Sequence, residues 1–141
     1  MVSFILIVNK KCQTRYSRYF DIIPLKNDIH FEYELANLCV NRPPHHTLFF
    51  KYEGLNIVYR NYASLYIIVG STKQENEFSI LEWIQLFVET MDTYFDRVTE
   101  LDLLFQLEKV HMIIEELLPK GIIGETSQER ILSPFLLRSK N

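Results

Sequence analysis

Three strand-like runs lie between residues 47 and 70, with only tight turns separating them. Residues 47–52 and 55–62 are rich in aromatic and branched side chains, and only Glu53-Gly54 lies between them. A two-residue connection of this kind predicts a β-hairpin, because parallel strands need a much longer crossover. Residues 64–70 form a third, more apolar run, which is typical of a central strand. The fold of this chain must therefore include a sheet built from neighbouring strands.

The first part of the chain predicts another hairpin, followed by a helix. Residues 4–8 and 14–23 are strand-like, and a short polar segment separates them. Asn27 or Asp28 is a candidate helix cap. Apolar residues then recur at three- and four-residue steps until Pro43-Pro44, where proline ends the helical pattern. The expected buried stripe of this helix is Ile29, Tyr33, Ala36 and Val40.

The second half of the chain is helical by its periodicity. The stripe of the first helix there is Phe78, Leu81, Ile84, Val88, Met91 and Phe95. Thr99 and Asp102 resemble a capping box, with Asp in place of Glu, and predict a second helix that ends at Pro119. Its apolar positions are Leu103, Leu107, Val110, Ile114 and Leu117. A second capping box predicts a short last helix over residues 126–132.

The order of these elements, ββαβββααα, predicts the fold class. It favours an α+β domain in which a five-stranded antiparallel sheet is flanked by helices. The chain has 141 residues, of which 48% are hydrophobic and 13% aromatic, and this suffices for one sizeable core. Because no linker or internal repeat interrupts the pattern, we expect residues 1–141 to form a single domain.

Composition narrows the classes of function. The 15 basic and 18 acidic residues give a net charge of −3, which argues against a nucleic-acid partner bound through a global positive field. The first residues predict a buried strand, since they lack the features of a signal peptide, and no run is long enough to cross a membrane. Cys12 and Cys39 are typical of buried, reduced thiols. We expect a cytosolic protein whose membrane contact is indirect.

A search for catalytic or metal-binding patterns argues against an enzyme. His45-His46 follows two prolines and has no nearby partner ligands, so a solvated turn is favoured over a metal site. His111 is expected to be a core-edge histidine with a backbone partner. Cys12 lies among basic residues that could lower its pKa, although a turn thiol is the simpler interpretation. We predict no cofactor and no metal, and we expect Glu100, Asp102, Glu115 and Glu116 to solvate helix faces.

A basic cluster in the first hairpin has two interpretations. It consists of Lys10, Lys11, Arg15 and Arg18, in a chain that is acidic overall. It is either an ordinary solvated hairpin or a docking point for a carboxylate or phosphate. Arg15 suits the second role because a guanidinium can bind a carboxylate through two hydrogen bonds.

Several segments carry a recognisable pattern, in order, over about residues 1–135. They are residues 4–10 with Thr14-Arg15, then 59–66, 87–89, 94–95, 98–105, 109–111 and 125–127. Together they resemble the small, or sigma, subunits of clathrin-adaptor-type complexes. Residues 96–98, 109–111 and 130–134 lean toward the sigma subunit of the fourth adaptor complex, a non-clathrin coat of the trans-Golgi network.

This resemblance implies a longin-like fold and a role as the small subunit of a heterotetrameric vesicle-coat adaptor. The implied partners are the N-terminal solenoid of a large adaptor subunit, the other subunits of the heterotetramer and the cytosolic tails of membrane cargo. The implied location is cytoplasmic, peripheral on trans-Golgi network or endosome membranes. The alternative is a longin-like scaffold subunit of another trafficking complex, tethering or SNARE-regulatory, that binds no cargo.

The resemblance also implies a site for acidic dileucine sorting signals, [DE]xxxL[LI]. Arg15 matches the basic position that faces the acidic residue of the signal. Arg97 stands at a pocket rim where the dileucine-binding subunits carry a small polar residue, and its long side chain there would narrow the pocket or add charge. The positions that match the leucine pocket are Ala63, Leu65, Ile67, Val88, Val98 and Leu103.

Overall fold

A computed structural model of the chain describes residues 1–44, 46–72, 76–95 and 99–123. Its five strands are β1 (Phe4–Asn9), β2 (Thr14–Tyr19), β3 (Phe49–Tyr52), β4 (Leu55–Tyr62) and β5 (Leu65–Ser71). Its α-helices are α1 (Phe31–Val40), α2 (Glu77–Phe95), α3 (Glu100–Phe105) and α4 (Leu107–Leu117). Two short 3₁₀ turns, η1 (Pro24–Asn27) and η2 (Pro119–Gly121), follow β2 and α4.

The strands form one antiparallel sheet in the order β2-β1-β5-β4-β3. The sheet confirms the predicted α+β class and all five predicted strands. In the β3–β4 hairpin, Glu53 and Gly54 both have positive φ, as the favoured two-residue turn requires. Two strands are shorter than predicted, since β2 ends at Tyr19 and β3 begins at Phe49.

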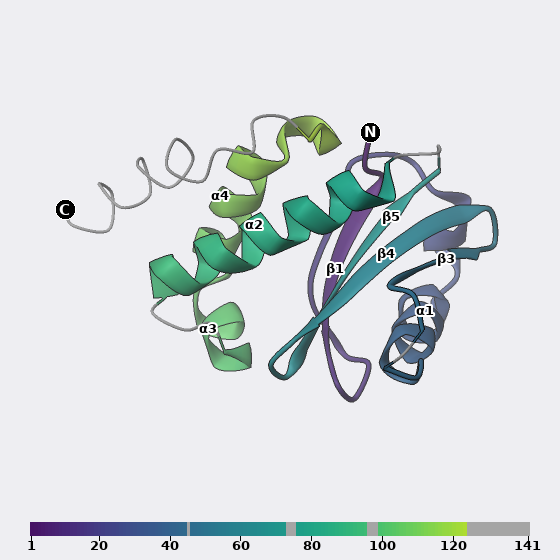
Figure 1. The fold of residues 1–141 in the computed structure, drawn as a ribbon, viewed down its shortest axis with the longest axis horizontal. Coiled ribbons are helices and arrows are strands. Elements are labelled where there is room, and N and C mark those ends of the chain that lie inside the picture. Colours follow the sequence, from purple (N-terminus) through teal and green to yellow (C-terminus); the bar gives the residue numbers. More distant parts are fainter. Residues whose placement is uncertain (45, 73–75, 96–98, 124–141) are drawn as a thin grey trace.

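Helices cover both faces of the sheet, with α1 on one face and α2 with α4 on the other (Figure 1). Successive residues of a strand point to opposite faces. Accordingly Phe4 and Leu6 of β1 pack in the cluster under α1, whereas Ile5 and Ile7 pack under α2 and α4. Every residue of β1 is buried for this reason. An apolar run without alternating polar residues therefore indicates a strand that is buried on both faces of the sheet.

The helix α1 differs from its prediction in both start and face. It begins at Phe31. Asp28 does not cap the helix, because its carboxylate accepts a hydrogen bond from the backbone N–H of His30. Ile29 lies outside the helix with 89% of its surface exposed, and Tyr33 is also exposed. The predicted stripe is thus wrong at Ile29 and Tyr33, whereas Ala36 is buried and Val40 packs, partly buried, against the same cluster. The residues that α1 buries are Phe31, Leu35, Ala36 and Cys39.

In α2 the core face is wider than the predicted stripe. Ile84, Val88 and Met91 are buried as predicted, but Phe78 is exposed. Trp83 stacks on Phe87, with ring centroids 5.3 Å apart. The indole N–H of Trp83 donates to the carbonyl of Leu117 at 2.9 Å, and this bond joins α2 to α4. A hydrogen-bonded Trp in a dry core fixes the spacing of the two helices.

The single helix predicted after Thr99 is in fact two helices. The capping box is confirmed, because Thr99 accepts from the backbone of Asp102 and Asp102 accepts from the backbone of Thr99. Gln106 then has a non-helical conformation, with φ −131° and ψ 42°, and separates α3 from α4. Leu103 of α3 and Val110 of α4 are buried, as the predicted stripe has them, whereas Leu107, the first residue after the break, is 41% exposed. The helix predicted over residues 126–132 lies outside the described residues.

Candidate functional site

Four of the residues predicted to bind leucines line one apolar pocket. They are Leu65 and Ile67 of β5, Val88 of α2 and Leu103 of α3. The pocket is completed by Ile7, Tyr62, Phe87 and Met91. The hydroxyl of Tyr62 donates to Asp92 at the side of this pocket, so the ring that lines it is held in place. The sequence therefore brings one strand and two helices to a common apolar point.

This apolar pocket is closed in the structure. Its free volume is about 10 Å³, which is roughly what a single water molecule needs. The four matching side chains are at most 6% exposed and belong to the core beneath α2 and α4. A leucine side chain cannot enter unless the walls move apart. The pocket is thus a packed part of the core whose lining side chains are apolar, as those of a leucine-binding pocket would be, and these side chains close it.

The other predicted site residues lie elsewhere or outside the description. Ala63 is exposed in the turn between β4 and β5, where its φ of 53° is unusual for a residue with a side chain. It does not line the apolar pocket. Arg97 and Val98 fall outside the described residues.

Arg15 makes a close ion pair. Its Nε donates to Glu100 Oε1 at 2.7 Å, and its Nη2 donates to Gln13 Oε1 at 2.8 Å. Asn9 also donates to Glu100 Oε1, at 2.9 Å. The hydrogen bonds from Asn9 and from Arg15 lower the pKa of the Glu100 carboxyl, because they stabilise its charged form. Arg15 and Glu100 are therefore held together as a charged pair across 85 residues of sequence.

The Arg15–Glu100 pair lies in a polar pocket of about 260 Å³. The two lysines of the first hairpin and Ser64 of the β4–β5 turn also line it, together with Asn9 and Gln13. This polar pocket and the apolar pocket share α3 and meet at the start of β5. Glu100 and Leu103 are one turn apart on α3, and Ser64 directly precedes Leu65. A polar pocket with basic side chains and an apolar pocket are thus neighbours.

A second arginine of the basic cluster is also paired. Arg18 Nε donates to Glu115 Oε1 at 2.7 Å. The expectation that Glu100 and Glu115 only solvate helix faces is therefore wrong. The sequence alone does not reveal these two acidic partners, because only folding brings α3 and α4 next to β2.

His111 lies beside the second ion pair. Its Nδ1 is 2.9 Å from the hydroxyl of Tyr16, and its Nε2 is 3.8 Å from Glu115 Oε1. The predicted backbone partner is thus replaced by a side chain of β2. Burial raises the pKa of Tyr16 to about 12, which keeps its hydroxyl neutral. Together these contacts attach α4 to the edge strand β2.

The two cysteines are buried free thiols, as predicted. Burial raises the pKa of Cys12, so the basic neighbours do not make it a reactive thiolate. Burial also raises the pKa of Cys39 to about 12. Neither thiol is suited to nucleophilic chemistry.

The described residues contain no cluster of three or more potential metal ligands among His, Cys, Asp and Glu. His45 lies outside the described residues, and His46 is exposed. A search of the same residues for a helix of the length and hydrophobicity needed to cross a membrane finds none.

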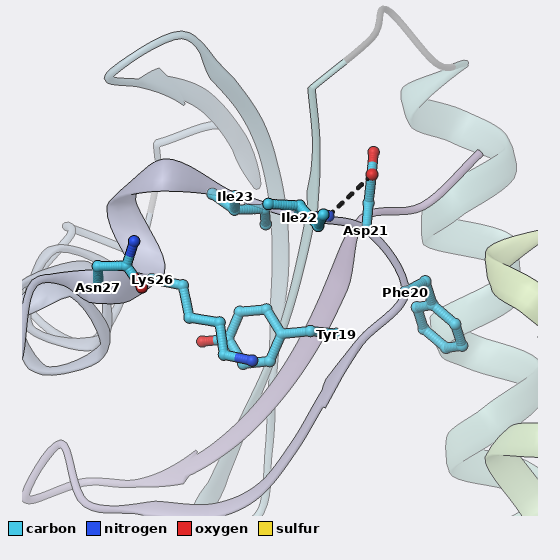
Figure 2. Close-up of a pocket in the computed structure, with 7 residues that line it drawn as sticks. All are labelled: Tyr19, Phe20, Asp21, Ile22, Ile23, Lys26 and Asn27. Atoms are coloured by element: carbon cyan, nitrogen blue, oxygen red, sulfur yellow. Dashed lines mark hydrogen bonds between the residues drawn. The ribbon is translucent and has the colours of Figure 1, made fainter.

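A further pocket, of about 510 Å³, lies where the chain leaves β2 for η1. Figure 2 shows its lining residues, in which the Lys26 ammonium lies over the Tyr19 ring, 4.4 Å from the centroid. The Asp21 side chain extends away from Lys26 and accepts a hydrogen bond from the backbone of Ile22. These polar groups do not converge on one point, so this pocket is a weaker candidate than the pair of pockets at α3.

Comparison with known proteins identifies the family. A family model described as the clathrin adaptor complex small chain matches residues 1–141. The AP-4 complex subunit sigma-1 of Homo sapiens is 42% identical over 140 residues, which cover 99% of this chain and 97% of the relative. The AP-4 complex subunit sigma of Arabidopsis thaliana is 45% identical over 139 residues, with the same coverage. Both agree with the predicted leaning toward the fourth complex.

A structural likeness agrees with these relatives. A chain in a homology model of the full-length AP-3 complex in a stretched open conformation matches with a TM-score of 0.77 and 30% identity. The match covers 99% of this chain and 94% of that chain. It supports the longin-like α+β fold predicted from the resemblance. The chain belongs to the clathrin adaptor complex small-chain family.

Proposed function

We propose that this chain is the small subunit of a heterotetrameric adaptor complex that works in intracellular vesicle transport. The observation that carries the proposal is the family match over the whole chain, together with relatives that are named as sigma subunits and are spanned almost completely. Its role is to complete and stabilise the core by binding the N-terminal solenoid of a large subunit. It acts on the cytoplasmic side of trans-Golgi network or endosome membranes, which it reaches through the complex.

An exposed apolar surface on α3 and α4 supports assembly with a large subunit. Phe105 is 81% exposed and Leu101 is 61% exposed, and both lie on α3. Leu104, Leu107 and Met112 extend this surface, which borders a groove of about 620 Å³ between β2 and α4. Several large apolar side chains on two short helices are costly to leave in water and are typical of a protein interface.

The assembly proposal is tested by co-expression with the large subunit. We expect Phe105→Ser to reduce the amount of the chain that co-purifies, because it removes the most exposed aromatic group of this surface. The matched control is Ile29→Ser, which removes an exposed apolar side chain next to α1 on the other side of the sheet. A parent chain that stays monomeric and does not bind any adaptor large subunit would contradict the assembly role itself.

We further propose that the paired pockets at α3 bind acidic dileucine signals. The leucines occupy the apolar pocket after its walls separate, and the acidic residue faces Arg15. Burying two leucines contributes roughly 3–6 kcal/mol at full burial, whereas a partly exposed ion pair contributes about 1 kcal/mol or less. The leucines therefore determine affinity, and the charge determines which signals are preferred.

The signal proposal is tested with a labelled peptide and the assembled core. We expect Leu65→Ser to abolish peptide binding and Arg15→Ser to reduce the preference for acidic over neutral peptides. If Arg97 blocks the pocket, Arg97→Asn should create or strengthen binding. If neither the parent nor Arg97→Asn binds any dileucine peptide, the signal site is refuted, while the assembly role is unaffected.

A further inference from the structure

The carboxylate of Glu100 occupies the place at Arg15 that the proposed function gives to the signal. It lies 2.7 Å from Arg15 Nε inside the polar pocket, and Asn9 holds the same oxygen from the other side. The side chains of Arg15 and Glu100 are 27% and 30% exposed, so a carboxylate from outside can reach the pair. A guanidinium that already has a carboxylate partner gains little from a second one, because the two anions repel each other.

The helix that carries Glu100 also closes the apolar pocket. Leu103 is fully buried in that pocket and follows Glu100 by three residues, so the two side chains lie on neighbouring faces of one helical turn. The helix α3 thus supplies both the carboxylate that is paired with Arg15 and one wall of the apolar pocket.

We propose that Glu100 is a specificity-determining residue that competes, from within the chain, with the acidic residue of a sorting signal. This inference rests on the proposed function of the paired pockets. An incoming carboxylate replaces the Arg15–Glu100 ion pair by a new one and does not add an ion pair. An acidic residue in the signal therefore raises its affinity only slightly in the parent, and raises it more when Glu100 is made neutral.

The experiment measures the ratio of affinities for two peptides. One is an acidic dileucine peptide, and the other has the acidic residue replaced by glutamine. Both are titrated into the assembled adaptor core by fluorescence anisotropy, with the parent, Glu100→Gln and the double variant Glu100→Gln with Arg15→Ser. The matched control is Glu82→Gln, which removes the same charge from an exposed position of α2 that lines neither pocket.

We expect Glu100→Gln to raise the affinity ratio of acidic to neutral peptide by about two- to fivefold, the worth of one partly exposed ion pair. The gain should disappear in the double variant and should be absent in Glu82→Gln. The gain should also shrink as salt is added, since the ion pair is partly exposed.

Three results overturn the inference. A ratio that Glu100→Gln leaves unchanged shows that Glu100 does not compete, and a ratio that falls shows that Glu100 instead positions Arg15 for the signal. In both cases the neutral peptide still binds, so the proposed signal site survives. If no peptide binds to any variant of a correctly assembled core, the signal site and the competition fail together. The yield of assembled core and its melting temperature identify variants that are merely misfolded.

Discussion

Leu103 and Leu104 are neighbours on α3 with opposite environments, and they give the sharpest test of the closed apolar pocket. Leu103 is fully buried, whereas Leu104 is 41% exposed. Leu103→Ala removes buried methyl groups and leaves a cavity in a wall that is already packed, so the free energy of unfolding should fall by about 2–5 kcal/mol. Leu104→Ala removes partly solvated surface, and the fall should be about 1 kcal/mol or less.

The assay is urea unfolding of the chain followed by tryptophan fluorescence. The sequence has one tryptophan, Trp83, which is buried against Phe87 in the same core. With a slope of about 1–3 kcal/mol per molar urea, the midpoint for Leu103→Ala should lie roughly 1–2 M below the parent. Equal midpoints for the two variants would refute the packing of Leu103 described above. A small loss for both would show that α3 is not held against the sheet in solution.

Three other outcomes follow from the geometry and are checked by simple measurements. Val88→Asp places a carboxylate in the core, and we expect a loss of several kcal/mol of stability, seen as a lowered melting temperature and poor co-purification with the large subunit. The pKa of Glu100 is lowered in the folded chain, so the stability that its charged form contributes is present above the ordinary pKa near 4.5 and is lost as the pH falls through the lower folded value. Urea unfolding of the parent and of Glu100→Gln at several pH values should therefore give a stability difference that is constant near pH 7 and shrinks in acid. Because the Cys39 thiol has a pKa of about 12 and is buried, alkylation at pH 8 should become fast only after denaturation, as mass spectrometry can follow.

The strands could be predicted from the sequence because their signals are local. The bounds of β4 are those predicted, since Glu53-Gly54 and the turn at Ala63 punctuate the chain on both sides. The capping box at Thr99 is equally local, and it is present. Each of these features depends on a few consecutive residues whose own backbone preferences decide the conformation.

The errors arose where packing between distant segments decides the outcome. In α1, Ile29 and Tyr33 have the right spacing for a buried face, but Phe31 and Leu35 have it too, and contact with the sheet selects the second pair. At Gln106 there is no glycine or proline to signal the break. Leu103 and Val110 are seven residues apart and would share one face of an unbroken helix, so the apolar pattern does not reveal the break either. The Arg15–Glu100 pair joins residues 85 positions apart, so no local pattern contains it.

Both anchor points of the proposed signal site involve side chains of the same short helix, α3. Glu100 is held at Arg15, and Leu103 forms one wall of the closed apolar pocket. A peptide must therefore bind the fraction of molecules in which these contacts have opened, and its apparent affinity is lowered by that fraction. Leu101 and Phe105 are exposed on the outer face of α3, where a partner could contact the helix and change the stability of the contacts on its inner face. If the proposed signal site exists, any such change would by linkage alter the affinity for the signal, and assembly on α3 would be coupled to signal binding beneath it.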